Sequence, residues 1–446
     1  MSAALLNIMA QEWWALVMFA VAILALLLGY PVAFTLGAVG LLFGAVFLDF
    51  TFFELLPLRI WGVMTNFTLL AVPLFIFMGI VLEKSGLAED LLETMGMLFG
   101  RVRGGLAVSI VLVGALLAAT TGVVGATVVT MTVIALPSML KNGYQKELST
   151  GTIAAAGTLG QIIPPSVILI LSGDVIGVPV GQLFAGAFVP GMALVVVYII
   201  FILVYAWLRP SVAPALKQSL QDGKGNLIGR VMRSLVPALF LILAVLGSIF
   251  FGIATPTESA AVGAIGALVL AALHQRLTLT NMRLAMTETT RMTSMVFIIL
   301  VGATTFGLVF RGLGGDGIVQ QLMTGLPGGE WGFLAVAMAV IFVLGFFLDF
   351  LEICFIVVPI FAPIAVSFGI DPLWFAILIA VNLQTSFLTP PFGFSLFYLK
   401  AAAPPGVNIA HIYRGIIPFV LLQVLVLAAV MAFPSLATWL PGLMAE

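Results

Sequence analysis

Charged residues are scarce in this chain. Asp, Glu, Lys and Arg make up 8% of its 446 residues, against roughly 25% in soluble domains. The formal net charge of −1 gives no electrostatic basis for binding nucleic acid. A single cysteine, Cys354, excludes an intrachain disulfide framework. Residues 1–12 hold no basic side chain ahead of the first apolar run, so we expect no cleaved secretory signal.

Residues typical of enzyme sites are equally rare. The chain has two histidines, His274 and His411, both near the ends of apolar segments, and no Walker A lysine motif. Residues 312–317 match the pattern G-x-G-x-x-G, but no strand is predicted before them, so the match does not indicate a dinucleotide site. These absences argue against metal-dependent hydrolysis and direct use of ATP. We predict a protein that is not an enzyme and carries no cofactor.

Apolar residues, by contrast, make up 62% of the chain. They form runs of about 17 to 25 residues along the whole length, and each run can cross roughly 30 Å of hydrocarbon as a helix. No soluble domain fits between the runs. The fold class predicted is therefore an all-α polytopic membrane protein.

Four helix-breaking residues recur at a fixed offset. Adding 226 to the positions of Pro137, Gly143, Pro164 and Pro165 gives Pro363, Gly369, Pro390 and Pro391. Such agreement indicates two halves of one design. Inverted repeats with broken helices are typical of secondary transporters, in which freed backbone groups meet substrate and coupling ion near the bilayer midplane.

The first repeat is predicted to cover residues 1–208. Its elements are spans at 13–28, 31–48 and 66–82, a surface amphipathic helix at 50–64, a charged loop around 84–103, a hairpin at 105–140, a broken helix at 149–176 and a last span at 184–208. Each hairpin arm is too short to cross the bilayer, which favours a re-entrant hairpin with its tip at mid-membrane.

A polar linker is predicted at 209–233, and the second repeat at 234–446. Its elements are spans at 235–252, 256–273 and 292–310, an amphipathic stretch at 277–291, a hairpin at 332–366, a broken helix at 372–400 and a final span at 415–437. Each repeat thus crosses five times and adds one hairpin. Because five is odd, the second repeat is inverted relative to the first.

The basic residues support this topology. If the N-terminus is external, 15 of the 17 Lys and Arg residues fall inside, and only Arg59 and Arg311 fall outside. A full crossing at 105–140 would move Lys141 and Lys146 outside. Both termini are therefore predicted to be periplasmic in a cytoplasmic membrane.

The proline pairs are the first candidates for transport chemistry. A pair within a spanning helix removes two backbone donors and leaves carbonyl groups unpaired. A dehydrated sodium ion suits such carbonyls because it needs several oxygen ligands. The alternative is a kinked structural helix, and recurrence of the break in both halves argues against it.

Asp349 and Glu352 are the acidic residues deepest in an apolar run. Their i, i+3 spacing places both on one face of a helix, and carboxylates inside a bilayer are costly enough to suggest a function. Asp349 is the better candidate for a cation ligand. The alternative is a pair of acids at a wet hairpin tip that bond only to backbone. For Glu258, at a helix start, N-terminal capping explains the residue at least as well as transport does.

Polar side chains next to the breaks are candidates for substrate binding. They are Gln161 and Ser166 in the first copy and Gln384, Thr385 and Ser386 in the second, with Glu352 at the hairpin tip. Any of these side chains could instead form an interhelical hydrogen bond. Helix N-termini at the tips and breaks favour an anionic substrate. No Arg or Lys lies deep in a span, so a carboxylate would be held by backbone N–H groups, hydroxyls and the bound cation.

At these residues the sequence resembles the large membrane subunit of tripartite ATP-independent periplasmic (TRAP) transporters, of the ion-transporter superfamily. The matching stretches are VPLF at 72–75, GLA at 86–88, GY at 143–144, LGQIIPPS at 159–166, FAGAFVPG at 184–191, TPTE at 255–258, GIDP at 369–372 and TPPFG at 389–393. The resemblance implies a sodium-driven importer that works by an elevator motion. It also implies two partners, a periplasmic substrate-binding protein and a small four-helix membrane subunit, in a bacterial or archaeal inner membrane.

The resemblance also implies two sodium sites. One would lie between the first hairpin tip, at Thr120, Thr121 and Gly122, and the break at Ile163 and Pro164. The other would lie between Asp349 and the break at Leu388 and Thr389. Many members have a Ser-Gly-Ser-rich first tip, whereas this chain reads Thr-Thr-Gly-Val-Val-Gly, so it departs from the family pattern at the first site. This variant and the Phe-Leu-Asp-Phe-Leu-Glu tip at 347–352 resemble a subgroup associated with uptake of 2-oxo acids or related organic acids.

Two other functions are compatible with the sequence. The first is a carrier of the divalent-anion type, which shares inverted repeats and hairpins but needs no binding protein. The second is a membrane scaffold or intramembrane enzyme that transports nothing. The latter predicts that Asp349 and both proline pairs can be replaced without loss of solute flux.

Overall fold

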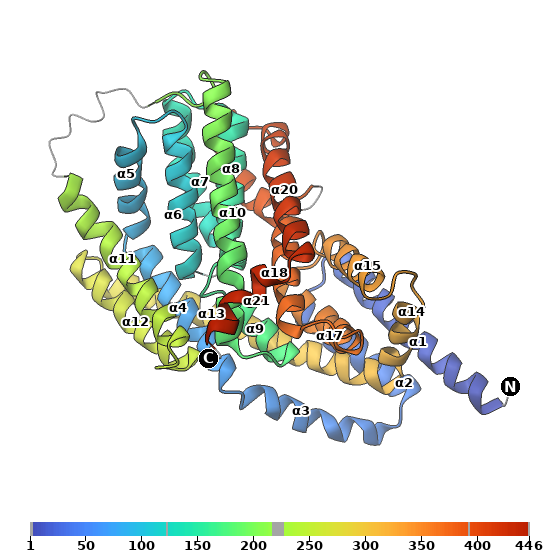
Figure 1. The fold of residues 1–446 in the computed structure, drawn as a ribbon. Helices are drawn as coiled ribbons and strands as arrows, with labels where there is room; N and C mark the ends of the chain where they lie inside the picture. The colour runs from blue at the N-terminus through green and yellow to red at the C-terminus, as the bar shows by residue number, and fades with distance from the viewer. Residues whose placement is uncertain (1–2, 122–123, 216–226, 391–392, 445–446) are drawn as a thin grey trace.

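The structure is a computed structural model that describes residues 3–121, 124–215, 227–390 and 393–444. Within these ranges every regular element is helical and no strand occurs (Figure 1). The all-helical fold class predicted from composition is therefore confirmed for the described chain.

The first half contains ten α-helices and three short 3-10 turns within the described ranges. They are α1 (Ala3–Leu27), α2 (Val32–Phe47), η1 (Phe50–Glu54), α3 (Leu55–Met64), η2 (Thr68–Leu70), α4 (Ala71–Lys84), α5 (Leu87–Phe99), α6 (Gly105–Thr121), α7 (Val124–Lys141), α8 (Lys146–Thr158), η3 (Leu159–Gln161), α9 (Val167–Ile176) and α10 (Val180–Leu208).

The second half contains the remaining helices of the described ranges. Its elements are α11 (Leu227–Phe250), α12 (Pro256–Leu273), α13 (Leu279–Gly312), α14 (Gly315–Thr324), α15 (Gly329–Leu344), α16 (Phe350–Glu352), the π-helical turn η5 (Ile353–Val357), α17 (Val358–Ser367), α18 (Pro372–Leu388), α19 (Phe394–Ala402), α20 (Ile409–Ala432) and α21 (Ser435–Met444).

The helix bounds of the two halves agree at the offset found in the sequence. Moving α7 by 226 positions gives residues 350–367, the range that α16, η5 and α17 cover together. The repeated glycines have the same role in both copies. Gly143 follows α7 and Gly369 follows α17, each with φ of +80°, a backbone conformation that favours glycine.

Helices at matching positions exchange packing partners between the halves. α2 packs against α13 while α4 packs against α12, and α8 packs against α20 while α18 packs against α10. α6, α7 and α10 run side by side in Figure 1, and α6 contacts the other two. A two-fold relation between the halves would produce this exchange; the inverted orientation of the repeats stays a prediction.

The seam between α8 and α20 is made by backbone. A Cβ on Gly151 would lie 2.1 Å from the carbonyl oxygen of Gly415, and a Cβ on Gly415 would lie 2.1 Å from the carbonyl oxygen of Glu147. No side chain fits at either position because both distances are far below van der Waals contact. The two helices therefore meet without side chains between them at this point.

Seven helices among the described residues are long and apolar enough to cross a membrane, or eight if the bent pair 50–64 and 68–84 forms one span. This confirms a polytopic membrane protein. The ten crossings expected from the sequence also require the shorter apolar helices, such as α2 and α18, to cross, and that number stays a prediction.

Two segments expected to be loops are helices. α5 occupies the predicted charged loop, because Glu89, Asp90 and Glu93 alternate with the buried Leu91 and Leu92 on an amphipathic helix. α14 occupies the segment after Arg311, between the predicted span 292–310 and the predicted hairpin 332–366, for which no helix was predicted. In both cases polar residues on one face masked the helical period.

Three boundaries also differ from expectation. The amphipathic stretch 277–291 and the span 292–310 form one helix, α13, which contains no proline to interrupt it. α11 already begins at Leu227, inside the predicted linker 209–233. The final span ends at Ala432, where Phe433 and Pro434 separate it from α21.

Candidate functional site

The first break lies between α8 and α9. After η3, the N–H groups of Ile162 and Ile163 both donate to the carbonyl of Leu159, at 3.1 and 2.9 Å. The peptide bond between Pro164 and Pro165 is cis, and neither proline has an N–H to continue a helix. The chain resumes as α9 at Val167, so the helix is interrupted at this proline pair.

The predicted substrate residues Gln161 and Ser166 lie together at this break, and both are fully buried. Ser166 Oγ donates a hydrogen bond of 2.8 Å to the backbone carbonyl of Gln161. The amide oxygen and nitrogen of Gln161 have no hydrogen-bond partner among the described residues. Leaving such a group unpaired in a protein interior costs about 1–3 kcal/mol. This orphaned amide marks a place where a bound species would find both a donor and an acceptor.

The second break, between α18 and α19, is closed by side-chain bonds to backbone. Thr389 Oγ1 donates to the carbonyl of Thr385 at 2.7 Å, and Ser395 Oγ donates to the carbonyl of Phe387 at 2.8 Å. Leu388 is fully buried and ends α18, whereas Thr389 is partly buried. The side chains of Thr385 and Ser386 donate within α18, to Val381 and Leu383.

Gln384 repeats the situation of Gln161. It is fully buried, and its amide forms no hydrogen bond of good geometry to the described residues, although the Tyr198 hydroxyl lies beside it. The two breaks therefore each carry a buried glutamine with an unpaired amide. In Gln384 the group lies one turn before the end of α18.

The first hairpin tip lies largely outside what the structure describes. Thr120 and Thr121 are the last residues of α6, and α7 begins at Val124. Gly122 falls in the gap between them, outside the described residues. The hairpin ligands of the first sodium site therefore stay a prediction.

The second tip contains a reciprocal cap. Asp349 Oδ1 accepts from the backbone N–H of Phe350 at 2.8 Å, and Glu352 Oε2 accepts from the backbone N–H of Asp349 at 3.1 Å. Asp349 is the N-cap of α16 and Glu352 its third residue. The two carboxylates lie together at the first turn of α16, with Asp349 as the residue before the helix and not within it. The backbone-capping alternative describes their hydrogen bonds.

Capping also accounts for Glu258. Glu258 Oε2 accepts from the backbone N–H of Thr255 at 2.8 Å, while Thr255 Oγ1 accepts from the N–H of Glu258 at 3.3 Å. This capping box opens α12, as the sequence led us to expect.

Gly345 allows the second hairpin to pack closely against α18, the helix before the second break. A Cβ on Gly345, at the end of α15, would lie 2.2 Å from Ser386 Oγ on α18. On the other arm, Cys354 Sγ lies 3.4 Å from Ser172 Oγ on α9. The hairpin thus touches both broken helices. Among the described residues, Asp349 forms no hydrogen bond to Thr389.

Three buried polar residues were not predicted from the sequence. Asn382 donates to the carbonyl of Met338 at 2.7 Å and joins α18 to α15. Gln423, on α20, lies 3.5 Å from Thr158 Oγ1 at the first break and is fully buried, as is Tyr198 on α10. A polar residue inside a long apolar run was the available signal in each case.

A cavity of about 550 Å³ lies beside the second hairpin. α3, α13, α14 and the π-helical turn line it, and Arg59 and Arg311, the two basic residues predicted to be external, are on its wall. Asp174, at the end of α9, also lines it and accepts a hydrogen bond from Asn66. Its size suits a small molecule.

The fold resembles that of a solved transporter. The YdaH transporter of Alcanivorax borkumensis superposes with a TM-score of 0.65 at 15% sequence identity, covering 93% of this chain and 99% of that one. At this identity the likeness concerns the fold alone.

Sequence relatives are closer. C4-dicarboxylate TRAP transporter large permease protein DctM of Pseudomonas aeruginosa is 31% identical over 389 residues, 87% of this chain and 89% of that protein. Ectoine/5-hydroxyectoine TRAP transporter large permease protein UehC of Ruegeria pomeroyi is 30% identical over 95% of this chain and 98% of its own length. Isethionate TRAP transporter permease protein DctMQ of Oleidesulfovibrio alaskensis is 29% identical over 84% of this chain and 58% of its own length.

A family model confirms the assignment over nearly the whole chain. Residues 16–436 match the family described as tripartite ATP-independent periplasmic transporter, DctM component. With helices that can span a membrane and two broken helices beside two hairpins, the chain belongs to the large permease family of TRAP transporters and is a membrane transport protein, not an enzyme.

Proposed function

We propose that this permease imports a small organic anion together with sodium ions, by an elevator motion of the hairpins and broken helices. The anion is a carboxylate, with 2-oxo acids and dicarboxylates as the first candidates. A periplasmic substrate-binding protein delivers it, and a small four-helix membrane subunit completes the complex. The complex lies in a bacterial inner membrane with both termini of this chain on the periplasmic side.

The observation that carries the proposal is the pair of orphaned amides. Gln161 and Gln384 are fully buried; Gln161 makes no hydrogen bond to the described residues, and Gln384 has only the Tyr198 hydroxyl nearby, without good hydrogen-bond geometry. An unpaired amide costs about 1–3 kcal/mol each, so two of them at two matching breaks indicate a polar ligand that compensates this cost in one state of the cycle. An amide can donate to a carboxylate and accept from a hydroxyl, which suits an organic acid.

The hydroxyls at the breaks support a role for a cation. Ser166, Ser386 and Thr389 each donate their proton to a backbone carbonyl. Their oxygen lone pairs are then free to face a positive ion. Freed carbonyls at unwound helix segments are the groups that coordinate sodium in broken-helix transporters.

The substrate class follows from the polarity of the breaks and from the relatives. α9 and α19 each begin directly after a break, so their N-terminal N–H groups favour negative charge there. The relatives are named for C4-dicarboxylates, isethionate and ectoine, all of which carry an anionic group. One relative is a single DctMQ permease protein, which fits a permease that works with a second membrane subunit.

Uptake into proteoliposomes tests the proposal. The permease and its partners are reconstituted, and uptake of a radiolabelled 2-oxo acid or C4-dicarboxylate is compared between an inward sodium gradient and an equal potassium gradient. We expect uptake only with sodium and only with the binding protein. Equal uptake in potassium would refute sodium coupling, and uptake without the binding protein would favour a self-sufficient divalent-anion carrier.

Substitution of Gln161 tests the site itself. Gln161→Leu removes an unpaired amide at similar volume, so we expect unchanged or higher stability together with at least a tenfold loss of uptake. The matched control is Gln320→Leu, on the exposed surface of α14, which should retain full uptake. A Gln161→Leu protein that transports normally would remove this residue from the substrate site.

A further inference from the structure

A second polar centre lies far from the breaks, where α5, α11 and α12 meet. A cavity of about 660 Å³ opens between these helices. Its polar lining includes Asp90, Arg230, Arg233 and His274, and its apolar lining includes Leu273. None of these residues takes part in the transport site described above.

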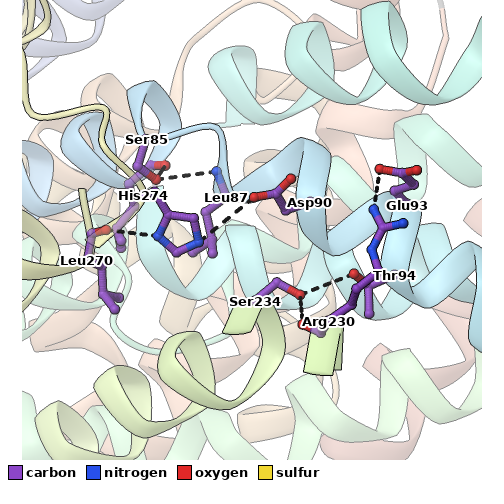
Figure 2. Close-up of polar contacts among 10 residues, drawn as sticks. Ser85, Leu87, Asp90, Glu93, Thr94, Arg230, Ser234, Leu270 and His274 are labelled. Carbon is purple, nitrogen blue, oxygen red and sulfur yellow. Dashed lines mark hydrogen bonds and ion pairs between the residues drawn. The ribbon is translucent and has the colours of Figure 1, made fainter. Parts of the chain in front are cut away.

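Hydrogen bonds and ion pairs fix the walls of this cavity, as Figure 2 shows. Arg230 on α11 pairs with Glu93 on α5 at 2.5 Å. Nearby, the hydroxyls of Thr94 and Ser234 lie 3.2 Å apart and join the same two helices. These contacts join α5 to α11, and Arg230, Thr94 and Ser234 themselves line the cavity.

The geometry of His274 leaves an unfilled position. Its Nδ1 lies 2.9 Å from the carbonyl oxygen of Leu270, and because a carbonyl only accepts, this contact places the proton on Nδ1. Nε2 faces the carboxylate of Asp90 at 3.8 Å; the contact is an ion pair when the ring is protonated, and Nε2 is an acceptor when the ring is neutral. Two acceptors that face each other call for a donor between them, and a primary ammonium group has three N–H donors.

The cavity also offers a free cation. Arg233 lines the cavity, is exposed, and forms no ion pair with any residue that the structure describes. A planar guanidinium binds phosphate oxygens in bidentate fashion. The cavity thus offers two hydrogen-bond acceptors, His274 Nε2 and the Asp90 carboxylate, to an ammonium group. It also offers the N–H donors of the Arg233 guanidinium to a phosphate.

The surroundings of the cavity are those of a membrane boundary. Met232 and Leu273 line it and are 58% and 72% exposed, as side chains facing acyl chains would be. The distribution of basic residues places this end of α11 and α12 on the cytoplasmic side. A polar cavity with an apolar, outward-facing rim at that level fits a molecule with a charged head and a hydrocarbon tail.

We propose that this cavity binds a zwitterionic phospholipid with a primary ammonium headgroup, such as phosphatidylethanolamine. The ammonium group donates to Asp90 and to Nε2 of His274, and the phosphate accepts from Arg233. Phosphatidylcholine lacks N–H donors for the first contact, and phosphatidylglycerol has no cation to meet Asp90. The site therefore discriminates by headgroup and not merely by charge.

Native mass spectrometry of the purified full-length chain tests the proposal. The protein in detergent is loaded with equal amounts of phosphatidylethanolamine, phosphatidylcholine and phosphatidylglycerol that carry the same acyl chains. We expect one copy of phosphatidylethanolamine to be retained roughly tenfold more than either other lipid, because charge-assisted hydrogen bonds are the strong ones. Equal retention of the three lipids would overturn the proposal.

Two substitutions locate the site. Asp90→Asn should lower the preference for phosphatidylethanolamine over phosphatidylcholine about tenfold, whereas Arg233→Gln should lower the retention of both, and Arg233→Lys should restore part of it. Glu89→Gln and Arg103→Gln are controls, since both side chains are exposed and neither lines the cavity. Preserved preference in a folded Asp90→Asn protein refutes the assignment. If that variant does not fold, unchanged retention in Arg233→Gln refutes it instead.

A soluble headgroup separates a lipid from a small phosphate ester. Glycerophosphoethanolamine carries the same ammonium and phosphate groups without acyl chains. We expect it not to displace the retained lipid at equal concentration. Displacement at equal concentration would show that the cavity takes a soluble phosphate ester and would overturn the lipid assignment.

Discussion

Replacement of Gly345 by alanine should destabilise the protein, because the structure has no space for the added methyl group. The added Cβ would lie 2.2 Å from Ser386 Oγ and 2.8 Å from Ser386 Cβ. Ser386 is fully buried and its hydroxyl is bonded to the carbonyl of Leu383 at 2.8 Å. The serine therefore cannot turn away without losing that bond, and the second hairpin has to shift from α18.

Two effects of opposite sign decide the magnitude. Gly345 has φ −65° and ψ −7°, a conformation that alanine adopts freely, so lower backbone entropy in the unfolded state alone would stabilise by about 0.4–1 kcal/mol. Overpacking of a buried contact costs about 1–3 kcal/mol. The clash is the larger effect, and we expect Gly345→Ala to lower the free energy of unfolding by about 1–2 kcal/mol.

The assay is a denaturant titration of the purified protein in mixed micelles. Gly247→Ala in α11 is the control, since no atom lies within 4 Å of the Cβ it would add, and it should be neutral or stabilising. Adding Ser386→Ala to Gly345→Ala removes the closest clashing atom and should recover part of the loss. Stabilisation by Gly345→Ala, or no recovery in the double variant, would refute the reasoning.

Three further substitutions test other contacts. Asp349→Asn keeps an N-cap acceptor, so stability should change by less than about 0.5 kcal/mol, while sodium-driven uptake falls at least tenfold if the carboxylate binds the ion. The control is Asp371→Asn, which changes the N-cap of α18 and should leave stability and uptake unchanged. Normal uptake in Asp349→Asn would assign that residue to capping alone. Asn382→Leu breaks the buried bond to Met338 and should cost about 1–3 kcal/mol in the same titration; an unchanged value would show that the bond adds nothing. Arg230→Gln breaks a half-exposed ion pair and should change stability by less than about 1 kcal/mol, so a larger loss would mean that the pair supports the fold.

The positions of the breaks and hairpins could be predicted because residues with strong backbone preferences set them. The proline pair at 164–165 ends one helix segment, and Gly143 and Gly369 follow their helices with the same positive φ. Such residues act through their own backbone and need no knowledge of neighbours. Apolar length in turn separated the membrane-crossing segments from the rest.

The helix α5 and the acidic tip could not be read correctly from the sequence for the opposite reason. Asp349 and Glu352 lie three apart in either a continuous helix or a capping box, and only the backbone of the hairpin decides between these arrangements. α5 owes its helix to burial of one face against α6 and α11, a tertiary effect. The orphaned amides of Gln161 and Gln384 likewise became evident only once their surroundings were known.

The glycine seam between α8 and α20 has a mechanical consequence. Side chains at an interface can change rotamer and absorb a small sliding movement, but two backbones in direct contact at Gly151 and Gly415 have nothing to rearrange. The first break lies at the end of α8, so a displacement of α20 moves α8 and the break by the same amount. Spin labels placed on these two helices should keep one fixed separation whatever ion or substrate is added. The distance between α8 and α20 can therefore serve as the reference against which movements of the other helices are measured.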